Sequence, residues 1–421
     1  MPMRKVLGCC FPMLAALTAC GDSSSDGGIV PPNGSNVAAV TVDAGPRGSS
    51  GQPVGYVNGI FTTVTVCVPG TSNCQDIDHV LVDTGSSGLR LLANDGRAGG
   101  QLSLQLQQQR DGSGNPVVAC TQFLDGFTWG PVVSADVKLA GETARVPIQV
   151  ISETTYSSVP SDCSGPNPND ESNIDALMTN GILGVGIFLQ DCGDACGADP
   201  RSGNNPGLYY GCSSPTSCSV TAVLPSAQVA NPVSMFASDN NGIILQLPAL
   251  PLNGAQSVSG SLIFGIDTQS NNSLGSATVL PVDPSNGTMT TVFNGSSYSG
   301  SFIDSGSNAI FFLSSSTTGM PDCPGQSSGF YCPSSMMTFS ATNQGVGGSP
   351  SATFNFVIGN ATSLFSSNGF AFANLGGPAF TGGSASQHGF DWGLSFFFGK
   401  SVYTAIEGRG TSRATGPFLA F

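Results

Sequence analysis

Basic side chains are scarce in this chain. Only 12 of its 421 residues are Lys or Arg, against 26 Asp or Glu, so the formal net charge is −14 although charged residues make up only 9%. Nucleic acids and anionic lipid surfaces are bound through clusters of basic side chains. The composition therefore predicts that neither nucleic acid nor a charged lipid surface is a partner.

Histidine is rarer still, with His79 and His388 as its two occurrences. Serine and cysteine nucleophiles commonly depend on a histidine base, and two histidines suggest no such triad. The Asp- and Asn-rich loops over 167–175 and 191–204 could bind calcium, but they lack the regular ligand spacing of an EF-hand loop. We therefore predict no metal ion and no cofactor.

Long apolar runs are absent after the N-terminus, so no later segment is expected to span a membrane. At the N-terminus, Arg4 and Lys5 precede an apolar run over 6–19, which is typical of a secretory signal peptide. The run ends in Leu17-Thr18-Ala19-Cys20-Gly21, which resembles the lipobox of bacterial lipoproteins. An ordinary signal peptide with an incidental cysteine is the alternative.

The lipobox resemblance implies a removable signal peptide over 1–19 and a lipid on Cys20. The stretch that follows is rich in Ser, Gly, Asp and Pro, and we predict a flexible tether over 20–45. We expect a lipid-anchored protein of the cell envelope that faces the periplasm or the cell surface, with the outer membrane favoured. The anchor is its expected contact with the membrane.

The cysteine count agrees with an oxidising compartment. Of 13 cysteines, two lie in the predicted signal peptide and Cys20 carries the lipid, which leaves an even number for disulfides. Pairing of Cys67 with Cys74, and of Cys323 with Cys332, is plausible because each pair closes a short, turn-rich loop.

Four further cysteines crowd a Gly- and Asn-rich section over 190–222 that has no hydrophobic periodicity: Cys192, Cys196, Cys212 and Cys218. Such a cluster could form a zinc site. Outside the cytosol two disulfides are favoured, so we interpret the section as an insertion pinned by disulfides.

Glycine (57 residues) and proline (28 residues) are abundant, and the apolar runs are short and separated by Ser, Asn and Gly. This punctuation indicates many strands and turns rather than helices. The predicted fold class is therefore all-β.

One motif occurs twice. An apolar strand leads into Asp83-Thr84-Gly85-Ser86 and another apolar run follows; the same pattern surrounds Asp304-Ser305-Gly306-Ser307. A carboxylate in a tight turn between buried strands is costly unless neighbouring donors hold it, and such a turn presents a reactive group on a rigid support. A single copy would be an ordinary solvated turn, whereas two matched copies indicate a paired site.

Each copy is followed, at a similar spacing, by an apolar strand that closes on glycine: Gly181–Gly186 after the first copy and Trp392-Gly393 after the second. This repetition predicts a duplication. We place an N-terminal β lobe over 46–235 and a C-terminal β lobe over 236–421, with one Asp turn in each.

In these motifs and in their order the chain resembles the pepsin-like aspartic proteases, in a bacterial lipoprotein branch. The two Asp turns match the active-site motifs of that family, 181–186 matches the strand of its first lobe, and Leu262–Asp267 resembles the strand that opens its second lobe. The resemblance implies a bilobal pepsin-like fold, with two duplicated β lobes and an active-site cleft between them.

The resemblance also implies a chemistry. Two carboxylates held close together share one proton, so one activates a water while the other polarises the scissile carbonyl. Carried over by position, Asp83 and Asp304 form this dyad. The other residues of the two turns support it: the glycines Gly85 and Gly306 give N–H groups, Thr84 and Ser305 hold the turns together, and Ser86 and Ser307 donate to the outer oxygens. These donors favour the ionised form and predict a mildly acidic optimum.

Three positions depart from the family pattern. The tyrosine of the family's flap aligns with Phe123, with Trp129 as a possible substitute, and Arg90 stands where a tryptophan usually supports the flap. The second apolar-apolar-Gly strand reads Asp391-Trp392-Gly393, with a charge in place of an aliphatic residue. These departures concern closure over a substrate more than the dyad.

The predicted function is that of a lipoprotein aspartic endopeptidase that hydrolyses peptide bonds without a covalent intermediate. Its partner is a peptide or protein substrate, and a monomer is expected because both Asp motifs lie on one chain. The alternative is a catalytically silent pepsin-like protein whose cleft, or whose 190–222 insertion, binds a peptide or an envelope partner. The missing flap tyrosine motivates this alternative.

Overall fold

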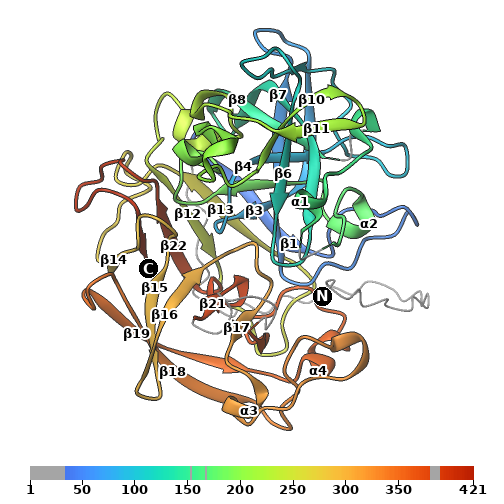
Figure 1. The fold of residues 1–421 in the computed structure, drawn as a ribbon. Coiled ribbons are helices and arrows are strands. Elements are labelled where there is room, and N and C mark those ends of the chain that lie inside the picture. The colour runs from blue at the N-terminus through green and yellow to red at the C-terminus, as the bar shows by residue number, and fades with distance from the viewer. Residues whose placement is uncertain (1–33, 152–153, 166–167, 380–388) are drawn as a thin grey trace.

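The computed structural model describes residues 34–151, 154–165, 168–379 and 389–421, and most of its regular structure is strand (Figure 1). The predicted signal peptide and Cys20 lie outside these residues. The α-helices of the described residues are single turns: α1 (Ser161–Ser164), α2 (Ile174–Leu177), α3 (Ser315–Thr318) and α4 (Ala361–Phe365). None of the helices in the described ranges is long and apolar enough to cross a membrane.

A 16-stranded sheet contains the first half of the chain and part of the second. Its strands in the first half are β1 (Val37–Asp43), β2 (Gly59–Cys67), β3 (Cys74–Asp83), β4 (Ser87–Leu92), β5 (Gln107–Gln108), β6 (Val117–Gln122), β7 (Phe127–Leu139), β8 (Glu142–Ile151), β9 (Gly181–Val185), β10 (Tyr209–Ser214) and β11 (Ser217–Val220). Those in the second half are β12 (Gly242–Leu247), β13 (Val258–Phe264), β14 (Val279–Pro281), β22 (Lys400–Ala405) and β23 (Phe418–Ala420).

Strand β1 connects the two halves. It pairs with β2 on one side and with β13 on the other, both antiparallel. The last part of the segment predicted as a tether over 20–45 is therefore a sheet strand. Alternate residues of β1, among them Val40 and Val42, are buried, and this period-2 burial explains why the segment is ordered in the sheet.

A seven-stranded sheet completes the second half. Its strands are β15 (Met289–Phe293), β16 (Ser296–Ile303), β17 (Ile310–Phe312), β18 (Met337–Gln344), β19 (Ser351–Ile358), β20 (Gly376–Pro378) and β21 (Asp391–Trp392). Phenylalanine rings and the indole of Trp392 fill its core, with the Phe390 and Trp392 rings stacked at 5.2 Å between centroids.

Both halves contain the same three-strand arrangement. In the first half β9 lies between β3, to which it is parallel, and β4, to which it is antiparallel. In the second half β21 lies in the same way between β16 and β17. The central strand is buried in each case because both of its neighbours and both sheet faces cover it. This repeated unit places one Asp turn in each half.

Candidate active site

The two Asp turns face each other. Asp83 ends β3 and Asp304 directly follows β16. The backbone N–H of Gly85 donates to Oδ1 of Asp83 at 2.8 Å and to Oδ1 of Asp304 at 3.1 Å. One N–H group thus contacts both carboxyl groups, which places the two side chains from opposite halves at a single site.

Each carboxyl group is held by the donors of its own turn. Oδ1 of Asp83 also accepts from the N–H of Ser86 at 3.2 Å, and the Ser86 hydroxyl donates to Oδ2. Oδ1 of Asp304 accepts from the N–H of Gly306 at 2.7 Å, and the Ser307 hydroxyl donates to Oδ2 at 3.1 Å. The two turns therefore hold their carboxyl groups with the same kinds of donor.

Thr84 and Ser305 join the turns beneath the carboxyl groups. The N–H of Thr84 donates to the hydroxyl of Ser305 at 3.1 Å, and the N–H of Ser305 donates to the hydroxyl of Thr84 at 2.9 Å. The Ser305 hydroxyl in turn donates to the Val82 carbonyl at 2.7 Å. Both side chains are buried, so these reciprocal bonds fix the separation and orientation of the two aspartates.

The protonation of Asp304 is set by its surroundings. Burial raises its pKa well above the usual value for an aspartic acid, and the charges of Asp83 and Asp391 raise it further, whereas the Gly306 N–H opposes the rise. Two carboxylates that face each other do not both ionise easily. The arrangement therefore favours one proton held by the pair of carboxyl groups, and a pair that shares one proton can act on a bound water as both acid and base.

The two glycines of the turns have no room for a side chain. A Cβ on Gly85 would lie 2.5 Å from Cγ of Asp304, and one on Gly306 would lie 2.8 Å from Oδ1 of Asp83.

We expect Gly85→Ala to push the carboxyl groups apart and to lower any peptidase activity by at least a hundredfold, because misplacement by about 1 Å has an effect of that size. Steady-state kinetics measures this loss. Gly96→Ala is the control for glycine replacement, since its Cβ would meet no atom within 4 Å and the strain that it adds comes from the positive φ of Gly96 alone. Equal losses of activity in the two variants would contradict the prediction.

Strands β6 and β7 form an antiparallel hairpin that carries Phe123, the residue that the sequence aligns with the flap tyrosine, and we call it the flap hairpin. Phe123 lies at its turn, where its N–H donates to the Gly126 carbonyl at 2.7 Å. The Phe123 ring packs against an apolar cluster that includes Leu177 and Ile182. Phe123 therefore makes an apolar contact at the turn where the resemblance leads us to expect the hydroxyl of a tyrosine.

Trp129 lies on β7 but does not take the place of the flap tyrosine. Its indole N–H donates to the Tyr156 carbonyl at 2.8 Å, and its ring packs on Tyr210 at 5.2 Å between centroids. The residue is buried in an apolar cluster. Its single donor is occupied there, so the interpretation of Trp129 as a substitute for the flap tyrosine is not supported.

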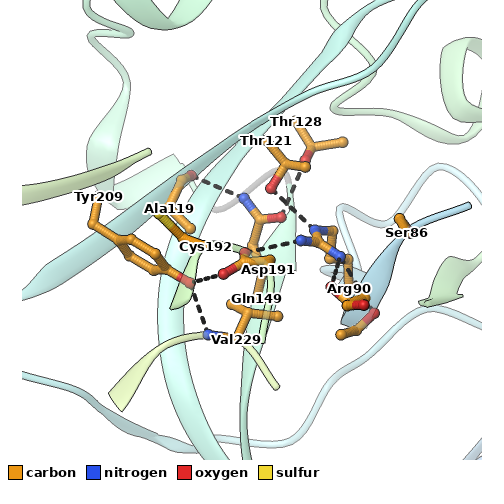
Figure 2. Close-up of polar contacts among 12 residues, drawn as sticks. Ser86, Arg90, Ala119, Thr121, Thr128, Gln149, Asp191, Cys192, Tyr209 and Val229 are labelled. Carbon is orange, nitrogen blue, oxygen red and sulfur yellow. Dashed lines mark hydrogen bonds and ion pairs between the residues drawn. The ribbon is translucent and has the colours of Figure 1, made fainter. Parts of the chain in front are cut away.

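Arg90 connects the start of β4, which directly follows the first Asp turn, to strand β6 of the flap hairpin (Figure 2). It is almost fully buried on β4, where its guanidinium donates to the carbonyls of Ser87 at 3.0 Å and Gly88 at 3.3 Å. Its Nε donates to the Thr121 hydroxyl on β6 at 3.0 Å. The flap thus has a hydrogen-bonded support at this position, from a guanidinium instead of an indole.

The charge of Arg90 is balanced by Asp191. Nη2 of Arg90 lies 2.9 Å from Oδ2 of Asp191, and Tyr209 donates to Oδ1 of the same carboxyl group at 2.5 Å. Burial raises the pKa of Asp191, whereas the charge of Arg90 lowers it. Sequence reasoning missed Asp191 and Tyr209, although Asp191 directly precedes Cys192 and Tyr209 lies in the same Cys-rich section, because nothing in their spacing indicates a partner on β4.

The Cys-rich section is pinned as predicted. Disulfides join Cys192 to Cys196 and Cys212 to Cys218, and the predicted pairs Cys67–Cys74 and Cys323–Cys332 are confirmed. A fifth disulfide joins Cys120 of the flap strand β6 to Cys163 of α1. Within the described ranges no group of three or more His, Cys, Asp or Glu side chains could hold a metal ion.

The fold of this chain is similar to that of an aspartic proteinase. The aspartic proteinase from Irpex lacteus superimposes with a TM-score of 0.51 and 16% sequence identity, over 91% of this chain and 96% of that chain. The predicted all-β, pepsin-like fold is thereby confirmed. The chain belongs to the family described as "Protein of unknown function (DUF3443)", whose profile matches residues 32–421. No curated protein matches the sequence significantly.

Proposed function

We propose that this protein is an aspartic endopeptidase and that Asp83 and Asp304 are its catalytic dyad. The observation that carries the proposal is the single N–H of Gly85 that contacts both carboxyl groups. The reciprocal bonds between Thr84 and Ser305 hold that geometry. The similarity to an aspartic proteinase supports the same chemistry by analogy of fold.

In the proposed reaction Asp83 is the base and Asp304 is the acid. Asp83 removes a proton from a water held between the carboxyl groups while the water oxygen attacks the peptide carbonyl carbon, and Asp304 gives its proton to the carbonyl oxygen. The resulting diol returns a proton to Asp304, Asp83 protonates the leaving nitrogen, and the carbon–nitrogen bond breaks. One water is consumed, and a carboxylic acid and an amine are formed.

Digestion of a mixed peptide library between pH 3 and 8 tests the proposal, with and without the aspartic-protease inhibitor pepstatin. We expect pepstatin-sensitive cuts at mildly acidic pH. Activity should extend toward neutrality before it falls, because the raised pKa of Asp304 keeps the shared proton bound as the pH rises. Cuts that persist in pepstatin, or an optimum in the alkaline range, would contradict the prediction.

The second candidate is a silent protein that binds a peptide without cutting it. The apolar Phe123 at the flap turn favours it, because a hydroxyl over the substrate is lost there. Capture of a stable, uncut peptide by folded wild-type protein would favour this function, and turnover of the same peptide would exclude it. For either function we propose the location that the N-terminal sequence predicts, a lipid anchor on Cys20 in the cell envelope.

A further inference from the structure

A third carboxyl group lies beside the two aspartates, on β21. In the sheet, Asp391 pairs with Phe302 of β16 on one side and with Phe311 of β17 on the other. The flanking Phe390 and Trp392 stack on each other in the core. Since side chains alternate along a strand, the Asp391 side chain points to the sheet face opposite to that of Phe390 and Trp392.

That face is the face of Asp304. Asp304 follows Phe302 by two residues and so projects to the same side as Phe302 and its neighbour Asp391. The effects on acidity agree with this placement, because the charge of Asp391 contributes to the raised pKa of Asp304 and the charge of Asp83 contributes to the raised pKa of Asp391. Asp391 is therefore a neighbour of the dyad.

The corresponding position in the first half is apolar. Val82 pairs with Leu183 in the first half and Ile303 pairs with Trp392 in the second, which makes Ile182 the counterpart of Asp391. Ile182 packs in the apolar cluster that also contains Phe123. The two halves thus present different chemistry on either side of the dyad, an apolar surface on the first and a carboxyl group on the second.

The Asp391 carboxyl group lacks a full set of partners. Its residue is only 8% exposed, and among the described residues no group donates to its Oδ1. Burial and the charge of Asp83 raise its pKa to about 8, and the Ser307 hydroxyl opposes that rise. A buried, unpaired carboxyl oxygen is costly, so a cation brought by a ligand would find an acceptor that nothing else in the described protein occupies.

Further carboxyl groups lie on the flap side. Asp125, in the hairpin turn, is close enough to Asp83 for the charge of Asp83 to contribute to its raised pKa. Burial and the charge of Asp125 raise the pKa of Glu171 to about 9. The surroundings of the dyad therefore hold several buried carboxyl groups, and a bound cation would lower their raised pKa values and favour their charged form, which suits a basic side chain.

We propose, on the basis of the protease function above, that Asp391 is the specificity determinant of an acidic subsite that takes a Lys or Arg side chain next to the scissile bond. Ile182 and Phe123 form an apolar subsite on the other side of the dyad. The substrate class is then an extended peptide in which an apolar and a basic residue flank the cleaved bond.

The test uses a series of statine-containing peptides, which bind an aspartic-protease cleft without being cut. Lysine is placed in turn at each of the two positions on either side of the statine, and each peptide is paired with one that carries norleucine, which lacks the ammonium group. Binding to the full-length protein is measured by calorimetry. The variants are Asp391→Ile, which copies Ile182, and Asp391→Asn, which keeps the shape; Asp194→Asn removes an exposed carboxylate as the control for net charge.

At one position the wild-type protein and Asp194→Asn should bind the lysine peptide about tenfold or more tightly than its norleucine partner. Both Asp391 variants should lose that ratio. A ratio that is equal at every position, or that survives in the Asp391 variants, overturns the subsite, and so does failure to bind either peptide.

Parallel digestion of the corresponding cleavable peptides separates the two proposals. Cleavage without lysine preference would leave the protease function standing and overturn the acidic subsite. Lysine-selective binding that depends on Asp391, without cleavage of any peptide, would support the subsite and contradict the protease function.

Discussion

Replacement of Asp83 or Asp304 by Asn should lower the rate of peptide hydrolysis by about a thousandfold or more, because each variant removes one of the two groups that move protons in the proposed reaction. The carboxamide keeps the size and shape of the side chain. The Thr84–Ser305 bonds beneath it remain in place. A loss of this size with retained folding therefore reports the chemistry of the carboxyl group.

The double variant sharpens this prediction. Residues that act as a unit show losses that do not add, so Asp83→Asn combined with Asp304→Asn should be about as slow as either single variant. Single-turnover assays on one library-derived peptide measure all three, with Asp194→Asn as the matched Asp-to-Asn control at an exposed position. Cleavage at the wild-type rate in either single variant, with the same cut site, would show that the dyad is not the catalyst.

The second large effect concerns stability. Arg90→Met should destabilise the fold by about 3–5 kcal/mol, because it leaves the Asp191 carboxylate buried without its cation. The combined variant Arg90→Met with Asp191→Leu should recover most of this loss, since an apolar pair of similar volume often replaces a buried ion pair at little cost. Urea unfolding with the disulfides intact measures both free energies.

The pH dependence of the Arg90→Met variant has a defined sign. Burial already raises the pKa of Asp191 and the charge of Arg90 lowers it, so loss of Arg90 raises that pKa further in the folded state. A carboxyl group with a raised folded pKa binds its proton more tightly than in the unfolded chain, and stability is lost as the pH rises toward the folded pKa. The variant should thus be closer to wild type at pH 5 than at pH 8.

An exposed ion pair provides the control for this experiment. Arg145 contacts Asp136 at 2.7 Å on the surface between β7 and β8. Arg145→Met removes the same functional group where solvent screens the charge, so little change in unfolding is expected. If Arg90→Met were as mild as Arg145→Met, the interpretation of Arg90 as the link between the start of β4 and the flap hairpin would be wrong.

Local pattern was enough to predict the units of the fold. Short apolar runs separated by glycine predict strands because strand burial has a period of two, and the repeated Asp-Thr/Ser-Gly-Ser turns predict a duplicated β architecture. The short-range disulfides Cys67–Cys74 and Cys323–Cys332 were also predictable, since each pair closes a short loop whose ends are close both in sequence and in space. The roles of Asp83 and Asp304 as catalysts stay predictions that the Asn variants test.

Tertiary structure alone decided the surroundings of those turns. Trp129 occurs on the predicted flap hairpin, but the strand pairing turns its indole to the Tyr156 carbonyl. Arg90 acquires a partner in Asp191, which the chain brings back from a loop after β9. These contacts depend on which strands become neighbours, and sequence spacing carries no signal for neighbours so far apart along the chain.

Asp391 shows the same division. The sequence shows only that a charged residue stands at position 391, where the apolar-apolar-Gly pattern of the family has an aliphatic residue. The register of β21 between β16 and β17 turns it to the face of Asp304 and away from the aromatic core. The sequence by itself determined two similar β units that each carry an aspartate turn, because periodicity and turn chemistry are local. Only the folded chain decided what lies beside those aspartates, because long-range strand register sets which side chains meet.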